Sequence, residues 1–307
     1  MHRPTSRSDW LSVVGSLFMT ITAVAGIEVG HWTSEEHATG VTVMTFPEPN
    51  VATVEVRGAA PGSRETALLE PGMRVEQIQA LVFSGGSAFG LATADGVTRA
   101  LAADGRGHPT PNGIVPIVPA AIIYDLNPES NFRPGAEEGT AAYRDRSSDD
   151  VVMGAVGAGR GATTSQWRGL DQSRPSGLGS ASVTMQGCTV GALAVVNAVG
   201  DVFTLEGMPL TGGDHVPGPP ALVIPAHTQT TLIAVATDAR LDRSTLLRLA
   251  IRAQDAVAAC IRPSHTRYDG DAAFAVSCGH LNGDPDALGE AAFVATARAI
   301  EAAIGPR

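Results

Sequence analysis

The sequence has few cysteines, few aromatic residues and an excess of acidic over basic residues. Its three cysteines are scattered without C-x-x-C spacing, which predicts neither a disulfide framework nor a zinc site and fits a reducing compartment. Lys and Arg number 21 against 31 Asp and Glu, and the net charge is -10. Without a basic run, the chain lacks the electrostatic footprint of a nucleic-acid-binding protein, and anionic membrane surfaces would repel it. The expected partner is therefore a small molecule.

The sequence also lacks a run of 18 or more apolar residues, so no membrane span is predicted. The apolar segment 11–25 follows basic residues and ends in small residues, as in a signal peptide. Asp9 and internal threonines interrupt that pattern, and Met19 opens a stretch typical of a first strand. We expect residues 1–18 to be an extension ahead of a single domain, 19–307, in a cytoplasmic protein. Export by a signal peptide is the alternative.

The composition is that of a packed α/β protein with many tight turns, since 44% of the residues are hydrophobic and 35 are glycine. Apolar or alternating runs predict strands at residues 40–46, 51–56, 114–126, 189–196 and 230–237. Helical periodicity and capping residues predict helices at residues 87–103, 242–261 and 284–304. Two polar segments, 127–150 and 207–225, interrupt this pattern, and the second is expected to be an exposed linker.

The motif Gly85-Gly86-Ser87-Ala-Phe-Gly has its serine one residue away from the position required in G-x-S-x-G, which excludes a nucleophile elbow. Two glycines and a serine that open a helix leave backbone N–H groups to hold a carboxylate or a developing oxyanion. We therefore expect Gly85, Gly86 and Ser87 to bind substrate. A strand-to-helix turn with a serine cap is the structural alternative.

The stretch Gly157-Ala-Gly159-Arg-Gly-Ala162 partly matches a dinucleotide-binding fingerprint. That motif must open an amphipathic helix and be followed by an acidic residue about 20 positions on, and neither context is present. The stretch predicts a glycine-rich strand and turn, and no cofactor is predicted.

Asp269-Gly-Asp271 places two carboxylates on the same side at the start of a strand-like run. Such a pair would titrate as a unit and could hold a proton near a nucleophile. Asp-Gly is also a common turn, which is the structural alternative. A metal site formed with His265 would be a weak ligand set, so no metal is predicted.

Thr230 and Thr231 open an apolar strand, where β-branched residues are favoured for structural reasons alone. The chemical alternative is that Thr230 is a nucleophile. A threonine hydroxyl needs a base, and cleavage of the chain immediately before it would place a free α-amine, with a pKa of about 7.7 to 8.0, beside the hydroxyl. Segment 207–225 would then lie near the end of the first fragment.

Seven segments in order between residues 20 and 279, including "LVFSGGSAFGLATADGV", "ALAVVNAVGDV", "TTLIAVATDARL" and "AIRAQDAVAACIRPSHTRYDGDAAFAV", resemble the self-processing L-aminopeptidase/D-esterase family, DmpA-like, which includes nylon-oligomer hydrolases. The resemblance implies an αββα sandwich of the DmpA/ornithine-acetyltransferase type, similar to N-terminal nucleophile hydrolases. It also implies self-cleavage into an α chain, 1–229, and a β chain, 230–307, and a homotetramer of αβ units.

The resemblance assigns roles to individual residues. It implies that Thr230 is the nucleophile, that Asn197, which otherwise reads as a hairpin-turn residue, helps form the oxyanion hole, and that Asp269 and Asp271 lie beside the nucleophile. The GGSAFG turn would then line the cleft. The chain departs from the family at Gln229, where Asn or Gly is usual, and at Ser165, Gln166 and Arg168, where other members have Tyr or Lys.

These features predict a self-processing hydrolase, an aminopeptidase or amidase that acts on short peptides, amino-acid amides or esters and needs no cofactor. Two alternatives remain at this stage. One is acyl transfer of the ornithine-acetyltransferase type, and the other is an unprocessed, non-catalytic relative that binds a metabolite.

Overall fold

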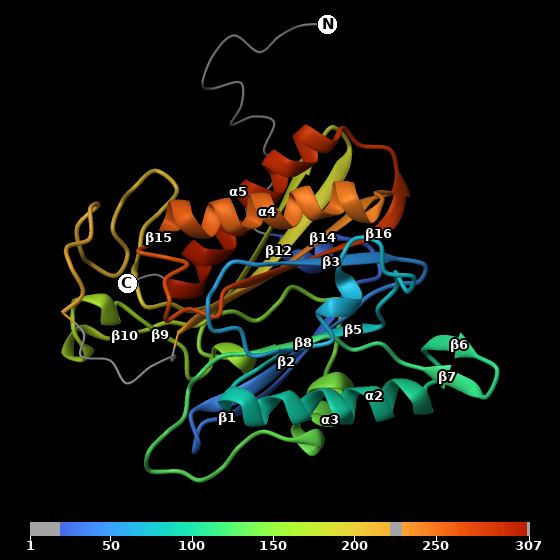
Figure 1. Cartoon of the computed structure of the whole chain (residues 1–307), viewed down its shortest axis with the longest axis horizontal. Helices are drawn as coiled ribbons and strands as arrows, with labels where there is room; N and C mark the ends of the chain where they lie inside the picture. The colour runs from blue at the N-terminus through green and yellow to red at the C-terminus, as the bar shows by residue number, and fades with distance from the viewer. Residues whose placement is uncertain (1–18, 222–228, 306–307) are drawn as a thin grey trace, which may run out of the picture.

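Two five-stranded sheets stack face to face in the computed structural model, which describes residues 19–221 and 229–305 (Figure 1). The first sheet has the strand order β1 (Glu28–Ser34), β2 (Thr39–Thr45), β5 (Ala80–Ser84), β8 (Ala120–Ile122), β4 (Ser63–Arg64). The second sheet has the order β11 (Leu178–Met185), β12 (Cys188–Asn197), β14 (Thr230–Ala239), β16 (Ala272–Leu281), β3 (Val51–Val56). The predicted extension, 1–18, lies outside the described residues.

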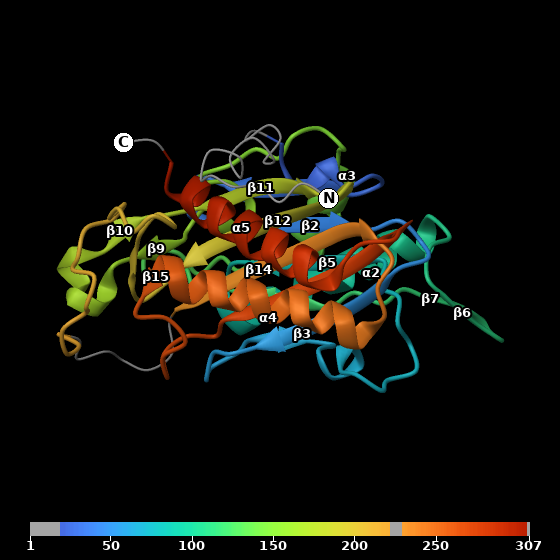
Figure 2. The ribbon, with the colours of Figure 1, turned by 90° about the horizontal axis from the view of Figure 1, so that it is seen from above.

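Helices cover the outer face of each sheet. Helices α4 (Arg243–Cys260) and α5 (Pro285–Ile304) lie side by side over the second sheet, and α2 (Thr93–Ala103) and α3 (Ala136–Arg144) lie under the first (Figures 1 and 2). Asp284 caps α5, as the sequence predicts, and Asp242 caps α4, since each carboxylate accepts a hydrogen bond from the N–H three residues on. The result is the αββα arrangement that the resemblance implies.

Shorter elements complete the chain. Two-residue and three-residue strands form three small ladders: β6 (His108–Thr110) with β7 (Gly113–Val115), β9 (Thr163–Thr164) with β10 (Arg174–Pro175), and β13 (Asp201–Val202) with β15 (Ile261–Arg262). Short 3₁₀ helices are η1 (Ile21–Ala23), η2 (Ala67–Leu69), η3 (Ser87–Ala92), η4 (Gly157–Gly159), η5 (Gln166–Arg168) and η6 (Leu170–Gln172).

The alternation of side chains along β14 determines the direction in which Thr230 points. Leu232 and Ala234 belong to the apolar core between the two sheets, whereas Ile233 and Val235 pack with residues of α4 and α5. Because residues i and i+2 of a strand share a face, the Thr230 side chain points into the layer between the sheets. It does so at the first residue of the strand, where that layer ends.

Three predicted elements differ from the structure. The polar segment 127–150 contains α3, whose Gly139 lies so close to α2 that an added Cβ would be 2.0 Å from the carbonyl oxygen of Thr93. The predicted strand 114–126 is divided into β7 and β8, because Pro116 and Pro119 cannot donate to a ladder. The predicted strand and turn at Gly157 is the short helix η4.

The predicted linker, 207–225, forms turns and one isolated bridge between Phe203 and Pro209 in its described part, 207–221. Within residues 19–221 and 229–305, no helix combines the length and apolar character that a membrane crossing needs.

Candidate active site

Strand pairing brings together two of the predicted site residues. Strand β14 lies between β12, which is antiparallel to it, and β16, which is parallel to it. In the first pairing Asn197 lies directly opposite Thr230. Residues directly opposite each other in an antiparallel pair have Cβ atoms roughly 5 Å apart on the same face. The amide of Asn197 is therefore a neighbour of the Thr230 hydroxyl, on the side that faces the other sheet.

The Thr230 hydroxyl contacts the carbonyl group of the residue before it. Thr230 is 4% exposed, and its Oγ1 donates a hydrogen bond of 2.5 Å to the carbonyl oxygen of Gln229. The same oxygen accepts the N–H of Gly270 at 2.9 Å. Two donors on one carbonyl oxygen polarise the C=O bond and make its carbon more electrophilic.

Gly270 can occupy its position only because it has no side chain. A Cβ at this residue would lie 2.8 Å from Oγ1 of Thr230 and 2.7 Å from the carbonyl oxygen of Ala60. The sequence predicts either a turn or a carboxylate pair at Asp269-Gly-Asp271. In the structure, the N–H of Gly270 also donates to the carbonyl group beside the Thr230 hydroxyl. Local sequence patterns do not reveal this contact.

The amide of Asn197 is held between the two sheets. Its Oδ1 accepts the N–H of Thr163 at 3.0 Å, and its Nδ2 donates to the carbonyl oxygen of Tyr124, which follows β8, at 3.3 Å. The side chain is fully buried. Asn197 is the last residue of β12 rather than a hairpin-turn residue, and its contacts orient the amide at the end of the inter-sheet layer.

Asp271 is tied to the strand that carries Thr230. Its Oδ1 accepts the N–H of Thr231 at 2.7 Å, and its Oδ2 contacts both the backbone N–H and the ring Nδ1 of His265, at 3.1 and 2.8 Å. Asp269 has different partners, because its Oδ2 accepts the N–H and hydroxyl of Thr266 at 2.8 and 2.6 Å. Both carboxylates are 1% exposed, so these hydrogen bonds replace the water that they lose.

The two carboxylates differ in their electrostatic surroundings. Burial, and after it the negative charge of Asp271, raises the pKa of Asp269 to about 7, although hydrogen bonds from Thr266 act in the opposite direction. Burial alone would lower the pKa of His265, but the hydrogen bond and charge of Asp271 outweigh it, and the pKa is raised. Asp269 can thus exchange a proton near neutral pH.

The raised pKa of Asp269 makes stability depend on pH. The ordinary pKa of an aspartate is about 3.9, so between that pH and 7 the unfolded chain releases a proton that the folded chain keeps. The contribution of Asp269 to stability is therefore complete below pH 4 and is lost as the pH rises to about 7. We expect the free energy of unfolding to fall by about 2 to 3 kcal/mol between pH 5 and 8 for this reason. The measurement uses a Thr230→Ala background, in which the chain is expected to stay uncut.

Urea unfolding at pH 5 and pH 8 measures this loss. Asp269→Asn should flatten the pH dependence of the free energy of unfolding by that amount. Asp286→Asn, at an exposed position in the first turn of α5, is the matched control and should leave it unchanged. An unaltered pH dependence in Asp269→Asn would mean that another group titrates in this range.

The backbone N–H groups of the GGSAFG turn differ from their prediction. We expected the N–H groups of Gly85, Gly86 and Ser87 to be left for a ligand, and this is wrong because each of them donates inside the protein. Their acceptors are the Gly40 carbonyl at 2.9 Å, Asp125 Oδ1 at 2.6 Å and the Ile123 carbonyl at 3.0 Å. The position of this turn beside the cleft stays a prediction.

Asp125 was missed from the sequence. It follows β8, accepts the Thr39 hydroxyl at 2.7 Å, and lies where a Cβ on Gly85 would be 2.1 Å from its Oδ2. Burial raises the pKa of this carboxyl group. The available signal was an acidic residue immediately after an apolar run.

Helix η5, which contains Gln166 and Arg168, contacts Gln229, the residue before Thr230. The side-chain amide Nε2 of Gln229 donates to Oε1 of Gln166 in η5. Ser165 is fully buried, whereas Arg168 forms a two-pronged ion pair with Asp201, with both N···O distances at 2.9 Å. Of Ser165, Gln166 and Arg168, Gln166 is the residue with a described hydrogen bond to Gln229.

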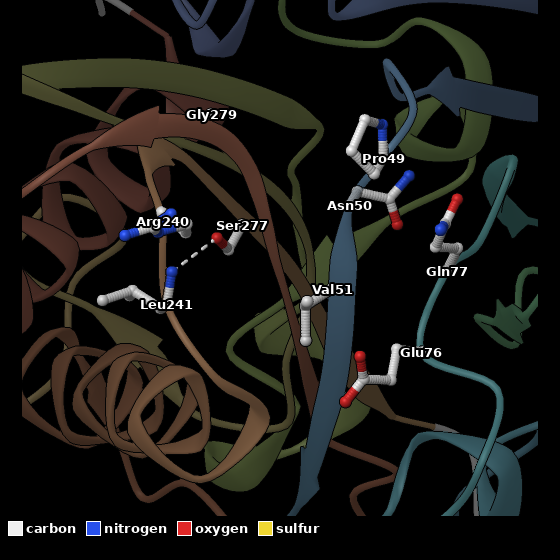
Figure 3. Close-up of a pocket in the computed structure, with 9 residues that line it drawn as sticks. All are labelled: Pro49, Asn50, Val51, Glu76, Gln77, Arg240, Leu241, Ser277 and Gly279. Atoms are coloured by element: carbon white, nitrogen blue, oxygen red, sulfur yellow. Dashed lines mark hydrogen bonds between the residues drawn. The ribbon is translucent and has the colours of Figure 1, made fainter.

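A separate cavity lies at the far end of β14. It has a volume of about 240 Å³ and is lined by residues that include Glu76, Gln77, Arg240 and Ser277 (Figure 3). Ser277 accepts the N–H of Leu241 there, so its hydroxyl is engaged by the backbone (Figure 3). Ten strand residues, roughly 30 Å, separate this cavity from Thr230, so it is not part of the cluster around Gln229.

In the described part of the chain, no three side chains of His, Cys, Asp or Glu are grouped so that they could hold a metal ion. His265 contacts Asp271, and Asp269 is engaged by Thr266.

Known proteins match most of this chain in sequence. The model of peptidase family S58 matches residues 19–305. An uncharacterized aminopeptidase of Mycobacterium tuberculosis is 41% identical over 87% of this chain and 84% of its own. A 6-aminohexanoate-oligomer endohydrolase of Paenarthrobacter ureafaciens is 28% identical over 84% of this chain and 74% of its own.

The fold matches a solved structure as well. The L-aminopeptidase D-Ala-esterase/amidase of Ochrobactrum anthropi, described as a variant of the Ntn hydrolase fold, aligns with a TM-score of 0.73 and 22% identity over 95% of this chain and 86% of its own. The predicted layered fold is therefore confirmed.

Proposed function

Since the chain belongs to peptidase family S58, it is a hydrolase, and we propose that it cuts its own chain between Gln229 and Thr230 and then uses the Thr230 hydroxyl to hydrolyse small amides or esters. One observation carries this proposal. Oγ1 of Thr230 donates to the Gln229 carbonyl oxygen at 2.5 Å, and the Gly270 N–H donates to the same oxygen.

The first step is an acyl shift within the chain. Oγ1 of Thr230 attacks the carbonyl carbon of Gln229, the C–N bond breaks, and the hydroxyl proton ends on the Thr230 nitrogen. The Gly270 N–H is placed to stabilise the negative charge that develops on the Gln229 oxygen. Water then hydrolyses the ester, which leaves a carboxylate on Gln229 and a free α-amine on Thr230.

Helix η5 contacts Gln229 and, earlier in the chain, residues 218–221. Gln166 binds the side chain of Gln229, and Trp167 donates from Nε1 to the Gly218 carbonyl at 2.8 Å and accepts the N–H of Ala221 at 3.1 Å. The contact with Gln166 supports a defined geometry at Gln229, although its side chain is longer than that of the Asn or Gly that is usual before the nucleophile.

Turnover uses the new α-amine as the base. At a pKa of about 7.7 to 8.0 it can take the hydroxyl proton as Thr230 attacks a substrate carbonyl. The amide of Asn197, opposite Thr230, supplies the oxyanion donor, Asp271 holds the strand through the Thr231 N–H, and Asp269 exchanges a proton. Water resolves the acyl-enzyme, and none of these steps requires a cofactor.

The relatives support the substrate class. Their names describe an aminopeptidase, an endohydrolase of 6-aminohexanoate oligomers and an L-aminopeptidase that is also a D-Ala-esterase and amidase. We therefore propose short peptides, amino-acid amides and esters, and related linear amides as substrates. We also propose that the protein is cytoplasmic and forms a homotetramer of αβ units. Sedimentation of the purified protein would test the tetramer.

A partition experiment tests the reaction type. We expect amino-acid p-nitroanilides and a 6-aminohexanoate dimer to be hydrolysed to free acid and amine. Addition of an amine acceptor such as ornithine should divert only a minor share of the acyl group. An acyl group that passes mainly to the amine would instead establish acyl transfer, and stabilisation by these compounds without turnover would favour a binding protein.

A further inference from the structure

We propose that His265 is a positioning residue of this site, which holds Asp271 so that its carboxylate fixes the backbone of the strand that carries Thr230. The inference rests on the proposed role of Thr230. It divides the predicted carboxylate pair into an anchor, Asp271, and a proton-exchanging group, Asp269.

The contacts of Asp271 are those of an anchor. One carboxylate oxygen accepts the N–H of Thr231, the residue after the nucleophile candidate, at 2.7 Å. The other oxygen accepts the backbone N–H of His265 at 3.1 Å and lies 2.8 Å from its ring Nδ1. The carboxylate therefore joins the start of β14 to the turn at His265 and is excluded from water.

The ring of His265 is held from both sides. Its second nitrogen, Nε2, lies 3.3 Å from the carbonyl oxygen of Gln254 in α4. Gln254 in turn donates from Nε2 to the carbonyl oxygen of Glu55 at 3.0 Å. A ring with an acceptor on each nitrogen is fully satisfied only when both nitrogens carry a proton, that is, as imidazolium.

The backbone of His265 is adapted to this contact. Its φ is +54°, a left-handed conformation that is uncommon for a residue with a side chain. Such a conformation persists where the surrounding contacts stabilise it, and it occurs here in the residue whose N–H and ring both meet the same carboxylate oxygen.

Asp271 acts through the backbone and not on the reacting hydroxyl. Ala273 and Ala275, which share its face of the strand, pack with α4 and α5, whereas the Thr230 side chain faces the layer between the sheets. The Asp271 carboxylate therefore meets this strand at the Thr231 N–H rather than at the Thr230 hydroxyl. This arrangement predicts an effect on alignment rather than on substrate binding.

The charges that face His265 determine its pH dependence. Asp271 and Asp269 face it from its own turn and the start of β16, and the Gln254 carbonyl faces it from α4. Together they raise its pKa despite burial. As the pH rises through that raised pKa, His265 loses a proton, one of its two acceptors loses a donor, and Asp271 loses its cationic partner.

Two substitutions that tolerate a positive φ test the proposal without added backbone strain. His265→Gly removes the ring, and His265→Asn keeps a neutral donor near the position of Nδ1. His280→Asn, at an exposed position in β16, is the matched control. For each variant we would measure the rate of self-cleavage, kcat and KM from pH 6 to 10, and the melting temperature.

We expect His265→Gly to lower both the self-cleavage rate and kcat by about 10- to 100-fold, with KM changed by less than about twofold, because misalignment of reacting groups costs rate rather than binding. His265→Asn should recover most of the rate and lose the alkaline decline of the wild-type pH profile. If His265→Gly does not fold, the pH profile of His265→Asn tests the inference alone, through the presence or loss of the alkaline decline.

Wild-type kinetics in His265→Gly, or an unchanged alkaline decline in His265→Asn, would overturn the inference while leaving the role of Thr230 intact. Retained activity in Thr230→Ala would instead overturn the proposed function itself. The two failures are therefore distinguishable.

Discussion

Replacement of Thr230 by alanine is expected to leave the chain uncut and inactive. The variant lacks the hydroxyl that donates to the Gln229 carbonyl, so neither the acyl shift nor the attack on substrate can begin. Loss of a hydrolase nucleophile costs on the order of 10⁶-fold in kcat. Electrophoresis, mass spectrometry and an amide-hydrolysis assay on the same preparation measure both effects.

Two neighbouring variants serve as controls. Thr230→Ser keeps a hydroxyl and should still be cut and active. Thr231→Ala removes the next hydroxyl of the same strand, which faces the helices, and keeps the N–H that binds Asp271, so it should also be processed. Full turnover in Thr230→Ala would require a different nucleophile. Loss of processing in Thr231→Ala would show that the effect of removing a hydroxyl here is not specific to Thr230.

Replacement of Asn197 by alanine is expected to separate the two reactions. The substrate oxyanion would lose its side-chain donor, and kcat should fall by about 10²- to 10³-fold, equivalent to about 3 to 4 kcal/mol. Self-cleavage should be much less affected, because the Gln229 oxygen is held by the Gly270 N–H. Single-turnover kinetics of processing and steady-state kinetics of the processed enzyme provide the comparison.

The control for Asn197→Ala must account for folding. Truncation leaves the Thr163 N–H and the Tyr124 carbonyl without this partner in a buried position, at a cost of about 1 to 3 kcal/mol in stability. Kinetics should therefore be measured well below the melting temperature, with the exposed Asn282→Ala as a reference. Equal losses in processing and turnover would indicate that Asn197 acts only through stability.

Much of the framework could be predicted from local patterns. The capped helices α4 and α5 and the strands β2, β3, β12 and β14 lie within a few residues of their predicted bounds, because each has a clear apolar period or a capping residue. The helix α3 was missed because it lies in a polar segment and contains Gly139, which disfavours a helix locally. Glu137 and Glu138 in its first turn and its packing against α2 compensate.

The site depends on contacts between distant residues, which local patterns do not encode. Asn197 and Thr230 were identified by resemblance, but their direct opposition is a property of strand register. The Gly270 N–H and the His265 ring could not be assigned because each acts through geometry rather than through residue type. The same limitation explains the error at Gly86, since its acceptor, Asp125, is 39 residues away.

The most direct test of the account is the intact mass of the purified wild-type protein, with N-terminal sequencing of any fragment. The account predicts two chains that meet at Gln229 and Thr230, the smaller beginning Thr-Thr-Leu-Ile. A protein that hydrolyses amides and remains a single uncut chain would contradict it, because the α-amine that serves as the base would not exist.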